Sequence, residues 1–424
     1  MSNQYPFYTE PTHDTGTPTV DASNAARTTT ESLAEERLIV EADNKIYLLE
    51  PNLHPFVTFL TSIGKQFNGS NYQGVGMLKK QVKNPEFKWF EDRYGGRFAK
   101  NSGTYAASGA VTITVTGAGS SSAYIFTVGD LFKNYRTGEV MLVATVASST
   151  TITVAAAGRA FGSTSAAAGA DGDSLYLIGN VNEENSGARN INTTRTSPET
   201  NYTQIFKTTI GISGTENEAG LYGGKDLPYQ RGKKGTEHAL DIERAFWFGE
   251  KKLDANGTQG HPRRATGGVL EFIESGDSYV QNQGGVLTAP DLNTFLQNAF
   301  TYGKPTKMLF AGGNVVNAIN EIARGQIQTK TGDKTYGISL NSWVTAFGTI
   351  NIVQNSLFVE DFAGYAFCLD INDFKYCSMA NRDTKLMTNV QGNDVDGVVD
   401  QYLTEVGLER VNAPKHALLK GVTA

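Results

Sequence analysis

The chain has 424 residues, of which 37 are basic and 43 acidic, and its formal net charge is −6. This balance argues against a protein built chiefly to grip nucleic acid, and an apolar content of 39% excludes disorder along the whole chain. No apolar run approaches the roughly 18 residues of a membrane span, and the N-terminus lacks a signal-peptide pattern. We therefore expect a soluble, cytosol-made protein of two or three domains.

The N-terminal part predicts an arm followed by helices. Residues 1–30 are rich in threonine and hold little that could form a core, so we interpret them as a flexible arm that becomes ordered on assembly. A permanently disordered tail is the alternative. A helix is expected from Ser32 towards Leu49, because a glutamate three residues after Ser32 completes a capping box. A second short helix follows Pro55 and ends at Gly64.

Residues 65–100 combine lysines, aromatic side chains and acidic side chains. Apolar residues alternate with polar ones at Val82, Phe87 and Trp89. This period of two residues predicts the extended strands of a hairpin with mixed charges on one face.

Residues 101–179 form a compositional island in which only seven of 79 positions are charged. Short runs alternate with the two-residue period of a strand and are separated by glycine or serine turns. The predicted strands are residues 112–115, 124–126, 140–143, 151–154 and 175–178. Five or six such strands are typical of a small β-barrel or sandwich, which we expect to be an inserted β-domain.

The remainder mixes helices with strands, so the predicted fold class is α+β. A helix over residues 236–252 is apolar on two sides, and we expect Phe246, Trp247 and Phe248 to lie in the core rather than at an interface. We expect Asp291 to cap a helix that continues to Phe300. The other predicted elements are strands 201–206, 208–212, 307–311, 350–353, 365–369, 385–387, 398–408 and 416–422, and helix 314–323.

No catalytic, cofactor-binding or metal-binding motif is present. The five histidines are scattered along the chain: His13, His54, His238, His261 and His416. Asp394 and Asp396 resemble part of a calcium loop, but the expected first and twelfth ligand positions are not acidic, which favours a plain hairpin turn. Cys368 is interpreted as a buried strand residue. We expect no enzyme activity, no metal and no cofactor.

The order of these parts resembles the major capsid protein of tailed bacteriophages, with the Hong Kong 97-type fold. Within that family the chain is similar to a subgroup that carries a β-domain inserted in the extended loop. The residues that carry the resemblance are Trp89-Phe90-Glu91-Asp92, Val128-Gly129-Asp130, Gly138-Glu139-Val140, Tyr202-Thr203-Gln204-Ile205-Phe206, Glu243-Arg244-Ala245, Phe248-Gly249 and Thr266-Gly267-Gly268-Val269-Leu270.

The resemblance implies a domain plan that covers nearly the whole chain. It implies an N-terminal arm with short helices, an extended loop with an inserted β-domain, a peripheral domain with a long spine helix, and an axial domain. The corresponding residues are 1–64 for the arm, 65–100 and 180–228 for the extended loop, 101–179 for the inserted β-domain, 229–265 and 381–424 for the peripheral domain, and 266–380 for the axial domain.

The resemblance also points to two sets of candidate contact residues. Candidates for contacts between subunits are Lys79, Lys80, Lys83, Lys88, Trp89, Glu91 and Asp92. A solvated face, in which each ion pair contributes little, is the alternative for the charged members. Candidates for sequence-independent contact with packaged DNA are Arg231, Lys233, Lys234, Arg263 and Arg264.

The implied function is self-assembly into pentamers and hexamers of an icosahedral head that encloses double-stranded DNA. The implied partners are copies of the chain, a portal protein, scaffolding and decoration proteins, and DNA bound non-specifically, with no membrane. The expected location is the virion shell, after synthesis in the host cytoplasm. Two alternatives stay open from the sequence: a tail or decoration protein with a glycan-binding β-domain, and an enzyme with an unrecognised site.

Overall fold

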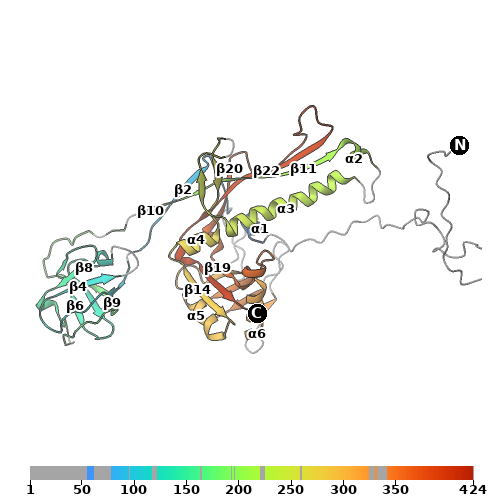
Figure 1. Cartoon of the computed structure of the whole chain (residues 1–424). Helices are drawn as coiled ribbons and strands as arrows, with labels where there is room; N and C mark the ends of the chain where they lie inside the picture. The colour runs from blue at the N-terminus through green and yellow to red at the C-terminus, as the bar shows by residue number, and fades with distance from the viewer. Residues whose placement is uncertain are drawn as a thin grey trace, which may run out of the picture.

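A computed structural model describes residues 55–61 and 78–423, with short gaps at residues 95, 117–121, 163–164, 192, 195, 220–224, 258–259, 324–329 and 332–340. The predicted arm and the helix that begins at Ser32 lie outside the described residues. Figure 1 shows a body that contains the long helix α3, and a separate group of strands at the end of a thin two-stranded ribbon.

The separate group, residues 98–180, is here called the β-unit. Its strands lie in the spatial order β6-β5-β9-β3-β4-β8-β7. Their bounds are β3 (Phe98–Asn101), β4 (Val111–Thr116), β5 (Asp130–Asn134), β6 (Val140–Leu142), β7 (Thr145–Val146), β8 (Thr151–Val154) and β9 (Ser174–Asn180). Alternate residues of β4 and β8 are buried in a core that belongs to the β-unit alone. Four of the five strands predicted here are confirmed, whereas their being a domain inserted in an extended loop stays a prediction.

One predicted strand of the β-unit is wrong. Residues 124–126 lie in and just after a 3₁₀ turn, η3 (Ser122–Ile125), not in a strand. Ala123 and Phe126 are both buried, and the Phe126 N–H donates to the Ala123 carbonyl at 3.1 Å. Because a 3₁₀ turn repeats every three residues, this conformation places both side chains in the core, which a strand would not.

The ribbon joins residues far apart in the sequence. Strand β2 (Glu86–Glu91) pairs antiparallel with β10 (Ser197–Tyr202), so the predicted hairpin within residues 65–100 is wrong. Beside it, β11 (Gln204–Ser213) pairs antiparallel with β22 (Gly397–Arg410) along its whole length. Strands β1 (Lys79–Val82), β20 (Phe374–Met379) and β21 (Lys385–Met387) complete this five-stranded sheet.

A second sheet of the body lies between two helical layers. Its order is β14-β23-β19-β15-β18-β17-β16. The bounds are β14 (Tyr279–Gly285), β15 (Thr306–Ala311), β16 (Lys330–Thr331), β17 (Asn341–Val344), β18 (Thr349–Gln354), β19 (Ala366–Leu369) and β23 (Ala417–Val422). Leu309 packs with α5 (Ala289–Ala299) and α6 (Gly313–Ala323), whereas its neighbour Phe310 packs in the core beside α3 (Asp226–Phe248). Burial on both faces explains why β15 is almost continuously apolar.

Helix α3 begins ten residues before its predicted start at residue 236. Gly232 and Gly235 lie in this added stretch, and glycine in a helix interior costs about 1 kcal/mol relative to alanine. Packing outweighs this cost: a Cβ at Gly235 would lie 3.3 Å from the Tyr402 hydroxyl, so the glycine admits the aromatic ring of β22. Pro228 stands in the first turn, where its missing N–H is not needed.

The predicted cap of α5 is displaced by three residues. Thr288, rather than Asp291, is the N-cap, and the two side chains form a reciprocal capping box. The remaining elements are α1 (Pro55–Thr61), α2 (Gly214–Glu218), α4 (Val269–Ser275), β12 (Lys252–Asp254) and β13 (Arg263–Ala265), and the 3₁₀ turns η4 (Ala156–Gly158), η5 (Glu360–Gly364), η6 (Ile371–Asp373) and η7 (Ala413–Lys415).

A buried carboxylate joins α1 to α3. Glu243 accepts hydrogen bonds from the backbone N–H groups of Phe56 and Val57 at 3.2 and 3.0 Å, and from the side chains of Trp247 and Asn355 at 3.2 and 3.1 Å. Burial raises the pKa of Glu243 to about 6, although all four donors oppose this shift. Because the folded state therefore holds this proton more tightly, the stability that the group contributes falls as pH rises from 4.5 to about 6.

The Glu243→Gln variant is expected to lower the free energy of unfolding by about 1–3 kcal/mol, because the amide N–H₂ must face at least one buried donor. The variant should also lose hydrogen-exchange protection at the amides of Phe56 and Val57. The control is Glu237→Gln, on the same helix, whose carboxylate pairs with Lys234 at the surface. Unchanged protection of the α1 amides in Glu243→Gln would refute this account of how α1 is held.

Candidate assembly surfaces

The ribbon has one covered face and one exposed face. Phe87 and Trp89 are buried against Val82 and Cys377. Phe90, the next residue along β2, is 71% exposed. The Trp89 indole N–H donates to Glu91 at 3.0 Å, and Glu91 also accepts from the backbone N–H of Asn412 at 2.9 Å. Trp89 and Glu91 therefore fix the base of the ribbon to the body within one chain.

Three of the four lysines predicted as contact residues have carboxylate partners in their own chain. Lys79 pairs with Asp383, Lys80 pairs with Glu409 at 2.7 Å, and exposed Lys88 pairs with Glu86 at 3.2 Å. Burial would raise the pKa of Glu409, but hydrogen bonds from Lys375 and Lys80 outweigh it, and the pKa lies below its usual value.

The other two members of this set are exposed. Lys83 lies just after β1, and Asp92 accepts from the Thr194 hydroxyl at 2.8 Å across the end of the ribbon. The structure thus places the whole set on β1, on β2 and on the residues just after them. Its role between subunits stays a prediction.

The basic residues predicted to face DNA fall into two groups. Arg231, Lys233 and Lys234 lie in the first half of α3, whereas Arg263 and Arg264 lie on β13, beyond the other end of that helix. At 1.5 Å per residue, the helix alone separates the groups by about 25 Å. They do not form one continuous patch.

Most of these cations already have partners. Arg231 pairs with the buried Asp400 at 2.6 Å, Lys234 with Glu237 at 2.6 Å and Arg263 with Asp254 at 2.8 Å. Lys233 and Arg264 form no ion pair with any residue that the structure describes. That these residues contact DNA stays a prediction. The ion pairs would raise the free-energy cost of such contact, because each paired cation would have to leave its carboxylate or share it with a phosphate group.

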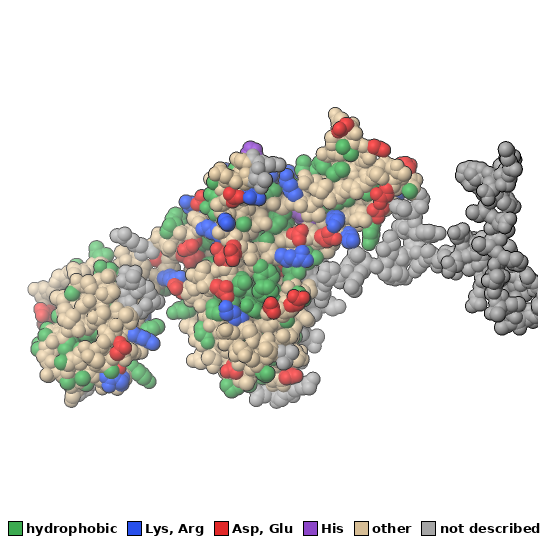
Figure 2. All heavy atoms as spheres, viewed as in Figure 1, with side chains coloured by type: hydrophobic (Ala, Val, Ile, Leu, Met, Phe, Trp, Pro, Cys, Tyr) green, Lys and Arg blue, Asp and Glu red, His purple; other side chains and the backbone are tan. Residues whose placement is uncertain are grey.

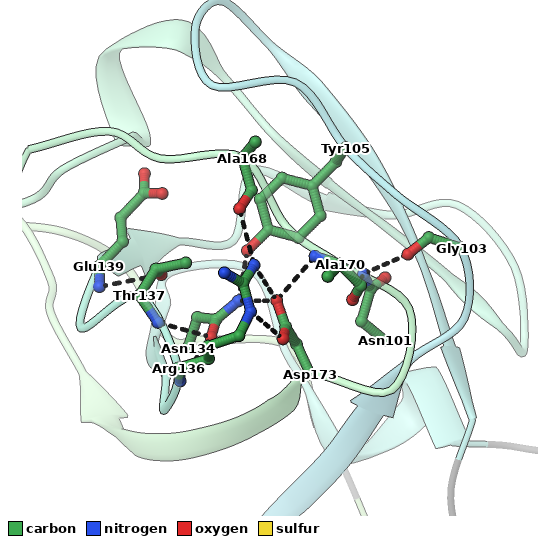
Figure 3. A network of polar contacts seen from close by, with 10 residues as sticks. All are labelled: Asn101, Gly103, Tyr105, Asn134, Arg136, Thr137, Glu139, Ala168, Ala170 and Asp173. Atoms are coloured by element: carbon green, nitrogen blue, oxygen red, sulfur yellow. Dashed lines mark hydrogen bonds and ion pairs between the residues drawn. The ribbon is translucent and has the colours of Figure 1, made fainter.

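Buried polar side chains tie the loops of the β-unit to its sheet (Figure 3). Asp173 accepts from Arg136 at 2.6 Å, from Asn134 at 2.9 Å and from the Ala170 N–H at 2.8 Å. The hydrogen bond from Arg136 is the main reason that the pKa of Asp173 falls to about 2. Asn134 also donates to the Tyr105 hydroxyl at 2.8 Å, so a single network holds the two loops that flank the sheet.

A second buried network centres on an ion pair. Arg159 donates to both carboxylate oxygens of Glu139, at 2.7 and 3.0 Å, and both side chains are almost fully buried. The backbone N–H groups of Ala160 and Ala167 donate to the same carboxylate. Burial would raise the pKa of Glu139, but these hydrogen bonds outweigh it and the pKa lies below its usual value.

Sequence reasoning missed both networks of the β-unit. The available signal was that seven charged residues stand within an otherwise uncharged island, so that each is expected to need a partner. Four of the seven are members of these two networks, and a fifth, Asp130, pairs with Arg189 at 2.5 Å. The sixth, Asp171, accepts from the backbone N–H of Gly103 at 2.7 Å. The seventh, Lys133, is exposed.

The described residues contain no cluster of three or more His, Cys, Asp or Glu side chains that could hold a metal ion. Within the same residues, no helix is long and apolar enough to cross a membrane. Cys368 is buried in β19, as predicted, and burial raises the pKa of its thiol to about 11.

Comparisons with known proteins identify the family to which the chain belongs. The family model described as the SU10 major capsid protein matches residues 19–423. The chain therefore belongs to this family of bacteriophage major capsid proteins, which confirms the resemblance to a phage major capsid protein. The more detailed assignment to a subgroup with an inserted β-domain stays a prediction.

Three solved structures are among those to which the chain is similar. The capsid of cyanophage A-1(L) is 10% identical, with a TM-score of 0.49, and the match covers 93% of this chain and 100% of the other. The capsid of the native GTA particle is 8% identical, with a TM-score of 0.47, over 95% and 100% of the chains. The SrpI encapsulin from Synechococcus elongatus PCC 7942 is 11% identical, with a TM-score of 0.41, over 54% and 78%. No curated protein matches the sequence.

Proposed function

We propose that copies of this chain assemble into the pentamers and hexamers of an icosahedral phage head that encloses double-stranded DNA. The observation that carries the proposal is the match of a major capsid family over residues 19–423. The shape of the chain supports it, because a β-unit with its own core stands away from the body on a ribbon (Figure 1). Such an extension buries surface only against other molecules.

We propose that each part of the chain has its own structural role within the shell. Residues 1–64 act as an arm, 65–100 and 180–228 as the limbs of an extended loop, and 101–179 as an inserted domain that braces neighbours. Residues 229–265 and 381–424 form a peripheral domain, and residues 266–380 an axial domain. The pairing of β2 with β10 fits two limbs of one loop. Helix α3, which begins at Asp226, extends the peripheral domain a few residues into the second limb.

The proposed partners are further copies of the chain, a portal protein, scaffolding and decoration proteins, and DNA held without sequence preference. Assembly would follow synthesis in the host cytoplasm and precede an expansion of the shell during packaging. Because the family is one of major capsid proteins, a tail or decoration role is not proposed.

The test is electron microscopy of the purified, concentrated chain. We expect closed shells with five-fold vertices. Stable monomers or trimers that never assemble, in the presence or absence of co-expressed phage structural proteins, would contradict the proposal.

A further inference from the structure

The outer face of the β-unit sheet carries apolar side chains where an antiparallel sheet with one core usually presents polar ones. Phe98 of β3 lies directly opposite Tyr176 of β9, and these side chains are 62% and 54% exposed. Ile178, two residues further along β9, is 51% exposed. Three large apolar groups on neighbouring strands form a patch of the kind that marks an interaction surface.

Two lysines give this patch a positive charge. Lys133 of β5 lies opposite Tyr176, and Lys100 follows Phe98 by two residues, so both belong to the same outer face. Both are exposed, and neither pairs with a carboxylate among the described residues. The arginines of the β-unit, in contrast, are paired with Asp173 and Glu139.

The opposite end of the molecule carries a patch of complementary chemistry, here called the acidic tip: residues 388–396, which join β21 to β22, together with α2. Val390 and Val395 are 40% and 52% exposed. Asp396 lies against Gly214 at the start of α2, which brings the exposed Asp394 and Glu216 into the same region. Figure 2 shows red side chains gathered at this end, far from the β-unit.

We infer that the apolar, basic face of the β-unit binds the acidic tip of a second copy of this chain. Both patches carry exposed apolar side chains, and their charges are of opposite sign. Opposite charges attract the two surfaces and favour one relative orientation over others. They cannot meet within one chain, because the body lies between them (Figure 1). A contact between different patches is heterologous, so it can repeat from copy to copy, and it closes a ring when the rotation between neighbouring copies closes. This inference rests on the proposed self-assembly and names the surfaces that perform it.

Disulfide trapping tests the contact directly. One full-length variant carries Ile178→Cys and a second carries Val395→Cys; Cys368 and Cys377 are buried, so the new thiols alone are accessible. After mild oxidation we expect a covalent dimer in the mixture of the two variants and none in either variant alone. Absence of the mixed dimer, or a dimer formed by Ile178→Cys alone, would overturn the inference.

Charge reversal gives an independent test with shells as the readout. Lys100→Glu with Lys133→Glu, or Asp394→Lys with Asp396→Lys, should each reduce the assembled fraction by more than about tenfold, because like charges would face each other. A chain that carries all four reversals should recover assembly, because opposite charges then face each other at every contact. Lys304→Glu, at an exposed lysine in the loop before β15, is the matched control. Normal shells from both reversed chains would overturn this inference alone, whereas failure of the unaltered chain to form shells would overturn the proposed function.

Discussion

Replacement of Arg159 by methionine is expected to unfold the β-unit while the body stays folded. The substitution leaves the Glu139 carboxylate fully buried without its cation, and loss of one partner of a buried pair costs about 3–5 kcal/mol. The core of the β-unit is separate from those of the body, so the cost should appear locally. Hydrogen exchange should show lost protection in β8 and β9 and unchanged protection in β15.

The control for this prediction is the same substitution at an exposed ion pair. Arg244 pairs with Asp241 three residues earlier on α3, and both side chains are more than half exposed. Arg244→Met should therefore change stability by less than about 1 kcal/mol. If Arg159→Met and Arg244→Met had equal effects, the buried pair would not be what holds the β-unit together.

Acidification is expected to destabilise the body through His416. This side chain is buried against the ring of Phe374, its Nδ1 accepts from the Asp370 N–H at 3.3 Å, and its Nε2–H donates to the Val411 carbonyl at 3.2 Å. Burial lowers the pKa of His416 to about 3, and nearby Lys307 adds to this effect. The folded state therefore keeps the ring neutral at a pH at which the unfolded chain binds a proton.

The sign of the pH effect follows from this difference. A lowered histidine pKa contributes stability that is complete above pH 6.5 and is lost as pH falls below it. At about 1.4 kcal/mol per pH unit, the loss between pH 6.5 and 4 is about 3 kcal/mol.

The His416→Gln variant separates the contribution of His416 to the pH dependence of stability from the contributions of the other titrating groups. Denaturant unfolding followed by tryptophan fluorescence should show the advantage of the unaltered chain over His416→Gln shrinking by about 3 kcal/mol across that range. His261 is exposed, and His261→Gln is the control that should leave the pH dependence unchanged. A constant difference between the unaltered chain and His416→Gln would show that His416 does not drive acid unfolding.

The class of protein and much of the local structure could be predicted from the sequence. Alternation at Thr112–Val115 and Thr151–Val154 identified two strands that the structure confirms as β4 and β8. The core position of Trp247 was also correct: the side chain is fully buried, and its ring lies about 5 Å from those of Phe56, Phe310, Phe358 and Phe367. In each case the signal was local, a hydrophobic period set by the geometry of one element.

The errors have a common cause, which is that a distant partner decided the outcome. Residues 124–126 look like a strand, but core packing of Ala123 and Phe126 favours a 3₁₀ turn. The Gly232 and Gly235 stretch looks like a loop, but the ring of Tyr402 stabilises it as helix.

By itself, then, the sequence determined the α+β class, the low charge of residues 101–179 and the resemblance to a phage capsid protein, because composition, periodicity and the order of elements are properties of the linear chain. Only the tertiary structure decided which charges are neutralised and which stay free. Ion pairing depends on distances between residues far apart in the sequence. In the β-unit it neutralises Glu139 and Asp173 inside and leaves Lys100 and Lys133 outside, beside Phe98 and Tyr176. The β-unit therefore has few charges overall but presents one face that is apolar and basic.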